Sequence, residues 1–190
     1  MLTALLDTSV LWPSLQRDFL LSLAVERLYR PVWSEAVLAE LEFHEAAKLV
    51  SRGADPADAD RRATALVATM RGVFGDALVV GWEHLEGSYG LPDADDEHVV
   101  AATVTGGAEL IVTANLRDFP AELLPGGLQA VPPAEFAAAA VSADPASARR
   151  AVAAIAARSG RVGTRWTEDE VLQLLVDRYG MQEAVVLLHS

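Results

Sequence analysis

Carboxylates are the residues of this 190-residue chain that could do chemistry together. Taken singly, an Asp after a strand is a common turn residue, and acids in a first helical turn are favourable without any ligand. Gathered at one place they would repel one another, and either protonation or a bound cation would relieve the repulsion. An oxygen-only cluster suits Mg²⁺ or Mn²⁺, and such a cation can polarise a phosphoryl oxygen and activate water. The acids concerned are Asp7, Glu40, the run Asp93, Asp95 and Asp96, and Asp118.

Strands and helices that alternate along the first 140 or so residues would bring these acids together. An apolar run from Ala4 leads into Asp7 and predicts a strand buried on both faces. In open α/β sheets ligands bind beyond the carboxyl ends of the strands, which is where Asp7 and Asp118 are expected. The pattern predicts an α/β sandwich with a central, mainly parallel sheet. Further strands are expected at 30–32, 77–80, 109–113 and 128–131, and helices at 14–27, 34–53, 55–75, 92–107 and from 133.

The chain changes character near 141–145, where an alanine-rich stretch begins. We therefore expect two parts, an α/β domain over 1–140 and a helical C-terminal extension over 141–190. Fifty residues make a poor independent core, so the extension should pack on the α/β domain or on a partner. Its expected helices are 144–160, 167–180 and 181–188.

Composition limits the class of protein. With 52% hydrophobic residues the chain can form a substantial core. The net charge of −12 argues against a protein that coats nucleic acid, but metal ligands contribute to that charge, so a nucleic-acid enzyme stays open. The absence of cysteine removes disulfides, thiol catalysis and thiolate metal sites. No apolar run is long enough to span a membrane and no export signal is evident, so a cytoplasmic location is expected.

Four segments of the chain carry these acids in a fixed order: LLDTSVL (5–11), SEAVLAEL (34–41), LPDADDEHVVAA (91–102) and AELIVTANLRDF (108–119). In that order, and with fitting secondary structure, they resemble the PIN-domain ribonucleases. The similarity is greatest to the VapC-type toxins of prokaryotic type II toxin–antitoxin pairs, and it covers residues 1 to 137. It implies a PIN-like three-layer sandwich, to which the C-terminal helices are an addition.

The resemblance also implies an activity, the Mg²⁺- or Mn²⁺-dependent hydrolysis of RNA phosphodiester bonds. Asp96 is preferred to Asp93 and Asp95 because the third acid of the family directly precedes the Val- and Ala-rich helix. Asp93 could then be an outer ligand, or Asp93 or Asp95 could share the role of Asp96. The catalytic and metal-binding acids so implied are Asp7, Glu40, Asp96 and Asp118.

Polar side chains near these acids match further positions of the family. Thr8 or Ser9, and the pair Thr113 and Asn115, could orient ligands through hydrogen bonds, or they could simply form turns. Arg117, beside Asp118, is a candidate phosphate contact or an ordinary surface residue.

Histidines, tryptophans and arginines have competing interpretations. His44 and His98 could be ligands or proton shuttles, but a hydrogen-bonded histidine at a helix edge is favoured. The four tryptophans are scattered, which favours core or interface roles over base stacking. Five arginines of the extension could guide an RNA backbone or form a solvated helix face, which is favoured: Arg149, Arg150, Arg158, Arg161 and Arg165.

The expected partners are an RNA substrate and a cognate antitoxin protein, and toxins of this type commonly form homodimers. Two alternatives stay open: a non-catalytic PIN-like binding or scaffold protein, and a housekeeping PIN nuclease without a toxin role. A dehalogenase-like phosphatase would need a second Asp two residues after Asp7, where the chain has Ser9.

Overall fold

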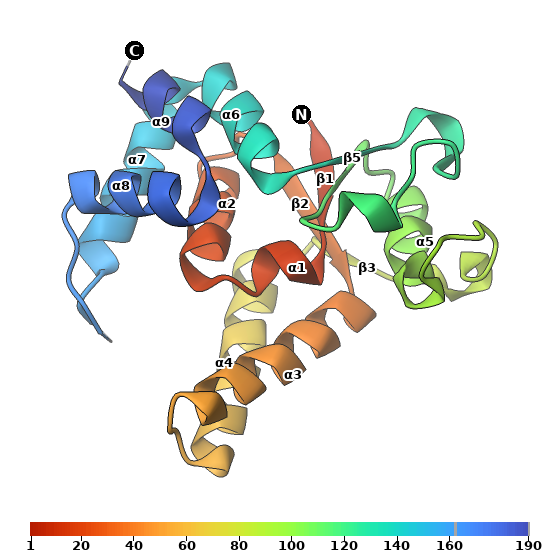
Figure 1. Ribbon diagram of the computed structural model, residues 1–190, viewed down its shortest axis with the longest axis horizontal. Coiled ribbons are helices and arrows are strands. Elements are labelled where there is room, and N and C mark those ends of the chain that lie inside the picture. Colours follow the sequence, from red (N-terminus) through yellow and green to blue (C-terminus); the bar gives the residue numbers. More distant parts are fainter. Residues whose placement is uncertain (162, 190) are drawn as a thin grey trace.

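The central sheet is entirely parallel, as the sequence predicts. The computed structural model describes residues 1–161 and 163–189 (Figure 1). Its five strands lie in the order β3-β2-β1-β4-β5, so the first strand is in the middle. All four residues of that strand are buried, and three of them, Ala4, Leu5 and Leu6, are apolar. The strands are β1 (Thr3–Leu6), β2 (Arg30–Ser34), β3 (Leu78–Val79), β4 (Leu110–Val112) and β5 (Gln129–Val131).

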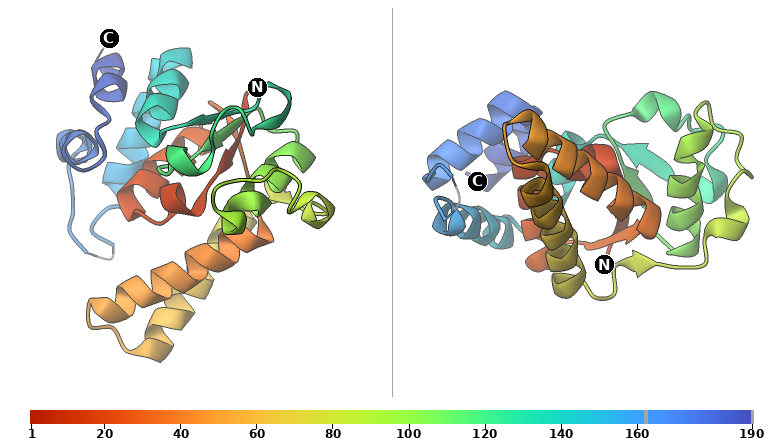
Figure 2. Two further views of the ribbon diagram at one scale, coloured as in Figure 1. Left: turned by 45° about the vertical axis from the view of Figure 1, so that its right-hand side comes forward. Right: turned by 90° about the horizontal axis from the view of Figure 1, so that it is seen from below.

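Helices cover both faces of this sheet and give three layers (Figures 1 and 2). Because side chains alternate along β1, Leu5 packs with α5 on one face, whereas Ala4 and Leu6 join the larger core on the other. The helices are α1 (Thr8–Leu11), α2 (Ser14–Val25), α3 (Glu35–Ser51), α4 (Pro56–Val73), α5 (Glu97–Thr105), α6 (Pro133–Ala143), α7 (Pro145–Arg158), α8 (Glu168–Tyr179) and α9 (Gln182–Leu188). No helix within the described residues is long and apolar enough to cross a membrane.

Helix starts follow the capping signals of the sequence. Side-chain oxygens of Ser34, Asp55, Asp144 and Thr167 each accept a hydrogen bond from a backbone N–H of the helix that follows. Thr167 forms a full capping box with Glu170. These four contacts fix where α3, α4, α7 and α8 begin.

The helix expected from residue 92 begins later. Residues Ala94–Asp96 form a 3₁₀ turn, η2, and α5 starts at Glu97. The reason lies in the preceding loop, because the Glu97 carboxylate accepts hydrogen bonds from the N–H groups of Tyr89 and Leu91, each at 3.0 Å. The Glu97 side chain thus holds the preceding loop against the first turn of α5, and Asp96 is the residue directly before that helix.

The C-terminal helices share the larger core with the α/β domain. Ile155 of α7 and Leu175 of α8 belong to the same hydrophobic cluster as Phe19 of α2. Ion pairs also join Arg150 to Glu26 and Arg158 to Asp18. In addition, Arg149 donates a hydrogen bond to the carbonyl oxygen of Leu188, at 2.7 Å.

These contacts of the three arginines favour a structural role over the guidance of RNA. The division of the chain at residue 140 stays a prediction, and α6 runs through that position.

Shared packing has a measurable consequence for stability. We expect Leu175→Ala, at a fully buried side chain, to cost about 2–5 kcal/mol and to shift the unfolding of the whole chain as one transition. Leu116→Ala removes the same atoms from a side chain that is 43% exposed and should cost much less. Urea denaturation followed by circular dichroism measures both. Two separate transitions, of which only one responds to Leu175→Ala, would show that the extension folds on its own.

Candidate active site

Asp7 is a buried carboxylate at the carboxyl end of the central strand. It is only 5% exposed, so its charge needs hydrogen-bond donors. Ser9 Oγ and Thr113 Oγ1 donate to its Oδ2 at 2.6 and 2.7 Å. Thr113 directly follows β4, which pairs with β1, so the parallel register places the two residues side by side. The backbone N–H of Asp7 also donates to the carbonyl oxygen of Val112, at 3.1 Å.

Glu40 lies on α3, and two side chains hold its carboxylate in place. Thr8 Oγ1 donates to its Oε2 at 2.6 Å, and His98 Nε2 lies 3.0 Å from its Oε1. Burial raises the pKa of Glu40, but the hydrogen bonds from His98 and Thr8 lower it by more, so that the net pKa lies below its ordinary value. Glu40 is therefore ionised at neutral pH.

His98 is the partner that the sequence left undecided. It lies in α5 and is 5% exposed. Burial lowers its pKa, but the hydrogen bond with Glu40 and the charges of Glu40, Asp7 and Asp96 raise it by more, for a net increase. Its Nδ1 has no hydrogen-bond partner within 1–161 and 163–189. The contact between the two side chains joins α3 to α5, and it is an ion pair when His98 is protonated.

Asp96 and Asp118 complete the acidic group. The pKa of Asp96 is raised to about 6, first by burial and then by the negative charges of Asp7, Asp118 and Asp93. Asp118 ends the 3₁₀ turn η3 (Leu116–Asp118) after β4, and its carboxylate lies 3.5 Å from the guanidinium of Arg117. Burial and the neighbouring negative charges thus both disfavour the ionised form of Asp96.

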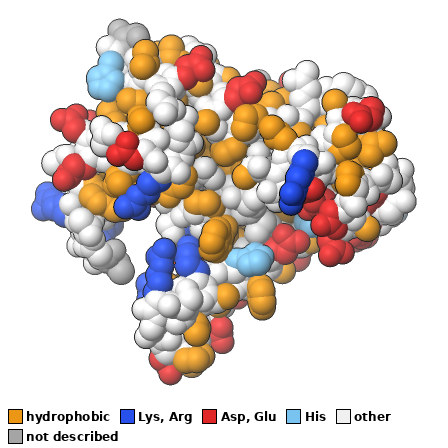
Figure 3. All heavy atoms as spheres, viewed as in Figure 1, with side chains coloured by type: hydrophobic (Ala, Val, Ile, Leu, Met, Phe, Trp, Pro, Cys, Tyr) orange, Lys and Arg blue, Asp and Glu red, His pale blue; other side chains and the backbone are white. Residues whose placement is uncertain are grey.

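Asp7, Glu40 and Asp96 line a pocket of about 350 Å³, whereas Asp118 and His98 are not among its lining residues. In Figure 3 acidic side chains gather where α1, α3 and α5 meet, with a histidine and hydrophobic side chains beside them. Asp93 is not among the lining residues; it is exposed, and its side chain accepts a hydrogen bond from the N–H of Asp95. The lining residues are Asp7, Thr8, Ser9, Trp12, Glu40, His44, Asp96 and Asn115.

The carboxylate oxygen atoms in this pocket are suitable ligands for a hard divalent cation. Asp7 and Asp96 offer carboxylate oxygens only, and the charge around Asp96 is what a cation would offset. No three His, Asp or Glu side chains of the described part of the chain are arranged as a ready metal cluster. Mg²⁺ commonly uses one or two carboxylates and keeps several waters, so two carboxylates meet its ordinary requirement. Each carboxylate oxygen of Glu40 already has a hydrogen-bond partner, Thr8 for Oε2 and His98 for Oε1.

Trp12 is the pocket residue that the sequence interpretation missed. Trp33 and Trp82 are buried, as expected of core tryptophans, but Trp12 is 42% exposed and lines the pocket. Its position just after the Asp7 segment was the one available signal. Asn115 also lines the pocket, and its backbone N–H donates to Thr113 Oγ1 at 3.0 Å.

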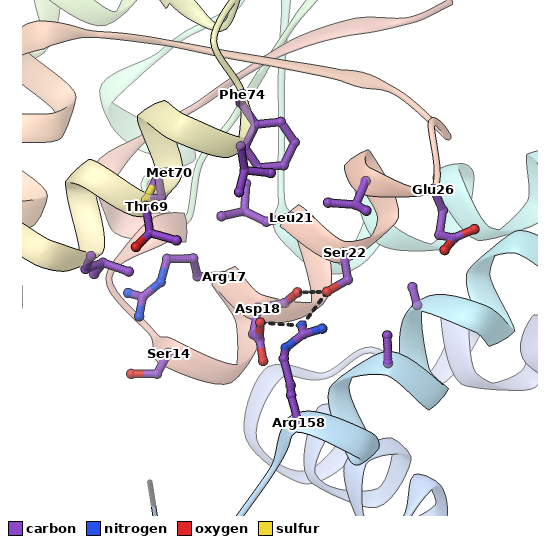
Figure 4. A pocket seen from close by; sticks show the side chains of 15 residues that line it. Ser14, Arg17, Asp18, Leu21, Ser22, Glu26, Thr69, Met70, Phe74 and Arg158 are labelled. Atoms are coloured by element: carbon purple, nitrogen blue, oxygen red, sulfur yellow. Dashed lines mark hydrogen bonds and ion pairs between the residues drawn. The ribbon is translucent and has the colours of Figure 1, made fainter. Parts of the chain in front are cut away.

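A larger pocket of about 500 Å³ lies elsewhere, between α2, α4 and α7 (Figure 4). Its lining is mostly apolar, and the polar groups that Figure 4 joins by dashed lines are Asp18, Ser22 and Arg158. Asp18 is paired with Arg158 there, so no uncompensated carboxylates gather as they do beside Asp96. The smaller pocket is therefore the better candidate for chemistry.

The charge on Asp96 should destabilise the cation-free protein. Because its pKa of about 6 lies above the unfolded value of 3.8, the folded state loses stability as pH rises between them. We expect Asp96→Asn, measured in excess EDTA at pH 8, to gain about 1 kcal/mol, or about 2–4 °C in Tm, after allowance for solvent screening. The gain should vanish near pH 4.

Asp95→Asn, at an exposed neighbour, is the matched control for this thermal measurement. A gain that is absent at pH 8, or equal at both pH values, would contradict the electrostatic explanation.

Comparison with known proteins gives a family. A family model described as the PIN domain matches residues 3–117. The search of curated proteins found no match, and neither did the search of solved structures. PIN domains are generally nucleases and typically use divalent metal ions. The matched segment contains β1, the Asp7 pocket and α5, and it ends one residue before Asp118. Together with the all-parallel sheet, this match shows that the chain belongs to the PIN domain family.

Proposed function

We propose that this protein is an Mg²⁺- or Mn²⁺-dependent endoribonuclease that hydrolyses RNA phosphodiester bonds. The observation that supports this most is the pocket that Asp7, Glu40 and Asp96 line together, where burial and then the negative charges of Asp7, Asp118 and Asp93 raise the pKa of Asp96. Repulsion between carboxylates costs the fold stability, and a bound cation would offset that repulsion and supply hydrolytic chemistry at the same place.

The four acids take different parts in the proposal. Asp7 and Asp96 hold the cation, and Asp118 completes the site beside them. Glu40 contributes a negative charge from α3, and the side chains of Thr8 and His98 fix the orientation of its carboxylate. When bound, the cation supplies Lewis-acid chemistry, since it offsets charge on the phosphoryl group and lowers the pKa of the attacking water.

Neighbouring side chains position these acids. The hydroxyl groups of Ser9 and Thr113 both donate to one oxygen of Asp7, so the other oxygen is left for a ligand. The backbone N–H of Asn115 in turn donates to Thr113. Arg117, whose side chain is 88% exposed beside Asp118, is proposed as a phosphate contact at the edge of the site. Asp93 has its side chain engaged in the η2 turn, which favours a role in the loop.

Loss of one central carboxylate should abolish the activity. We expect Asp7→Asn to lower the rate of Mn²⁺- or Mg²⁺-dependent cleavage of a fluorescently labelled RNA at least about a hundredfold, because it removes a ligand charge. The fold should persist, since Asn accepts hydrogen bonds from Ser9 and Thr113 as Asp does. Excess EDTA should stop the wild-type reaction.

Asp60→Asn, at an exposed position of α4, is the matched control and should cleave as the wild type does. A wild type that is inert with every divalent metal tested, or an active Asp7→Asn variant, would refute the proposal and favour the non-catalytic scaffold.

A toxin role within a toxin–antitoxin pair is the finer part of the proposal, and the resemblance to VapC-type toxins supports it. The partners would then be RNA, a cognate antitoxin and a second copy of the chain, in the cytoplasm. We expect expression of the wild type, but not of Asp7→Asn, to arrest growth, and co-expression of the adjacent small reading frame to relieve the arrest. Normal growth together with RNA cleavage in vitro would instead indicate a housekeeping nuclease.

A further inference from the structure

An exposed tryptophan borders the carboxylate pocket. Trp12 follows the last residue of α1, and its side chain lines the pocket together with Asp7 and Asp96. Its exposed fraction of 42% leaves much of a large apolar ring in contact with solvent. His44, one helical turn after Glu40, is exposed and lines the same pocket. Two aromatic side chains thus stand beside the charges proposed to act on a phosphodiester.

Trp12 is held in this exposed position by specific contacts. Its indole N–H donates to the carbonyl oxygen of His44, at 3.3 Å. Lys48 donates to the carbonyl oxygen of Trp12 at 3.1 Å, and its ammonium lies 5.6 Å from the centroid of the indole ring. The ring therefore has a fixed place relative to α3, the helix that carries Glu40.

A buried network of charges supports the same turn. Glu45 pairs with both Lys48 and Arg17, and all three side chains are at most 11% exposed. Arg17 in turn donates to the carbonyl oxygen of Leu11, at 2.7 Å. The carbonyl oxygens of Leu11 and Trp12 thus accept hydrogen bonds from two positively charged side chains that both pair with Glu45. Buried ion pairs are expensive to desolvate, so this network is weak as a source of stability and better explained as a means of fixing the turn.

The chemistry of the pocket indicates what the ring would bind. Acidic side chains repel the phosphates of RNA until a cation is present, so binding needs a contribution that does not depend on phosphate charge. Stacking of a base on an aromatic ring is such a contribution, and it tolerates any base because each has a π-face. A ring that is already fixed loses little conformational entropy on binding.

We propose that Trp12 stacks on an unpaired base of the nucleotide next to the phosphodiester held at the carboxylates, with His44 bordering the same base. This inference rests on the proposed ribonuclease function and assigns Trp12 as a substrate-binding residue. The Lys48–Glu45–Arg17 network acts through Trp12, because it positions the turn and not the substrate.

Binding of RNA tests the inference apart from cleavage. The full chain with Asp7→Asn keeps the RNA intact and serves as the common background, with Mn²⁺ present. Fluorescence anisotropy with a short unstructured RNA then compares Trp12→Ala, Trp12→Phe and the unaltered Trp12. We expect Trp12→Ala to bind about tenfold more weakly and Trp12→Phe to recover most of the loss.

Two controls separate stacking from a structural role. An abasic ribose-phosphate chain of the same length offers no base, so it should bind all three proteins equally. Val25→Ala shortens an apolar side chain that is 57% exposed at the end of α2 and does not line this pocket, and it should leave RNA binding unchanged within about twofold. An equal loss for Trp12→Ala on the abasic chain, or no loss on RNA, would overturn the inference.

The outcomes also distinguish this inference from the proposed function. Cleavage by the wild type together with full RNA binding by Trp12→Ala would refute the stacking role and leave the ribonuclease. Binding that depends on Trp12 and on bases, without cleavage under any divalent metal, would support the stacking surface and refute the nuclease. A wild type that neither binds nor cleaves RNA would refute both.

Discussion

Burial of the Asp7 charge at the end of the central strand is the constraint on which the site depends. A carboxylate that is 5% exposed is tolerated only with donors around it, and the protein supplies them from two neighbouring segments, Ser9 and Thr113. Both hydroxyl groups are in place because β1 and β4 are adjacent parallel strands. The negative charge of Asp7 nevertheless adds, with those of Asp118 and Asp93, to the burial that raises the pKa of Asp96. The fold thus brings together charges that it does not neutralise, which is the property that a cation-dependent nuclease needs.

The second half of the site depends on contacts between helices. Glu40 is oriented by Thr8 of α1 and His98 of α5, so a single carboxylate ties together helices from both faces of the sheet. Further along α3, Glu45 pairs with Lys48, which in turn binds the carbonyl oxygen of Trp12. Helix α3 therefore carries the Glu40 carboxylate and also, further along, the side chains of Glu45 and Lys48 that hold the turn of the exposed Trp12. We infer that α3 sets the geometry in which phosphate and base would be bound together.

Much of this could be predicted from the sequence where the cause is local or topological. Apolar strands, helix caps and the parallel order of the strands place Asp7 and Thr113 together. The pairing of His98 with Glu40 could not be predicted, because it depends on how α3 packs against α5 across 58 residues of sequence. The exposed position of Trp12 likewise depends on Lys48, far along the chain. The 3₁₀ turn before α5 was missed because Glu97 binds the preceding loop, which periodicity cannot reveal.

We propose that Asp7 and Asp96 together bind a divalent cation. Anomalous diffraction from crystals of the wild type soaked in Mn²⁺ tests it most directly, because the signal locates the metal without reference to activity. We expect a peak between the carboxylates of Asp7 and Asp96, and its loss in Asp7→Asn crystals treated in the same way. Saturating Mn²⁺ that gives peaks only elsewhere on the protein, or the same peak in both crystals, would show that these two carboxylates do not bind the cation.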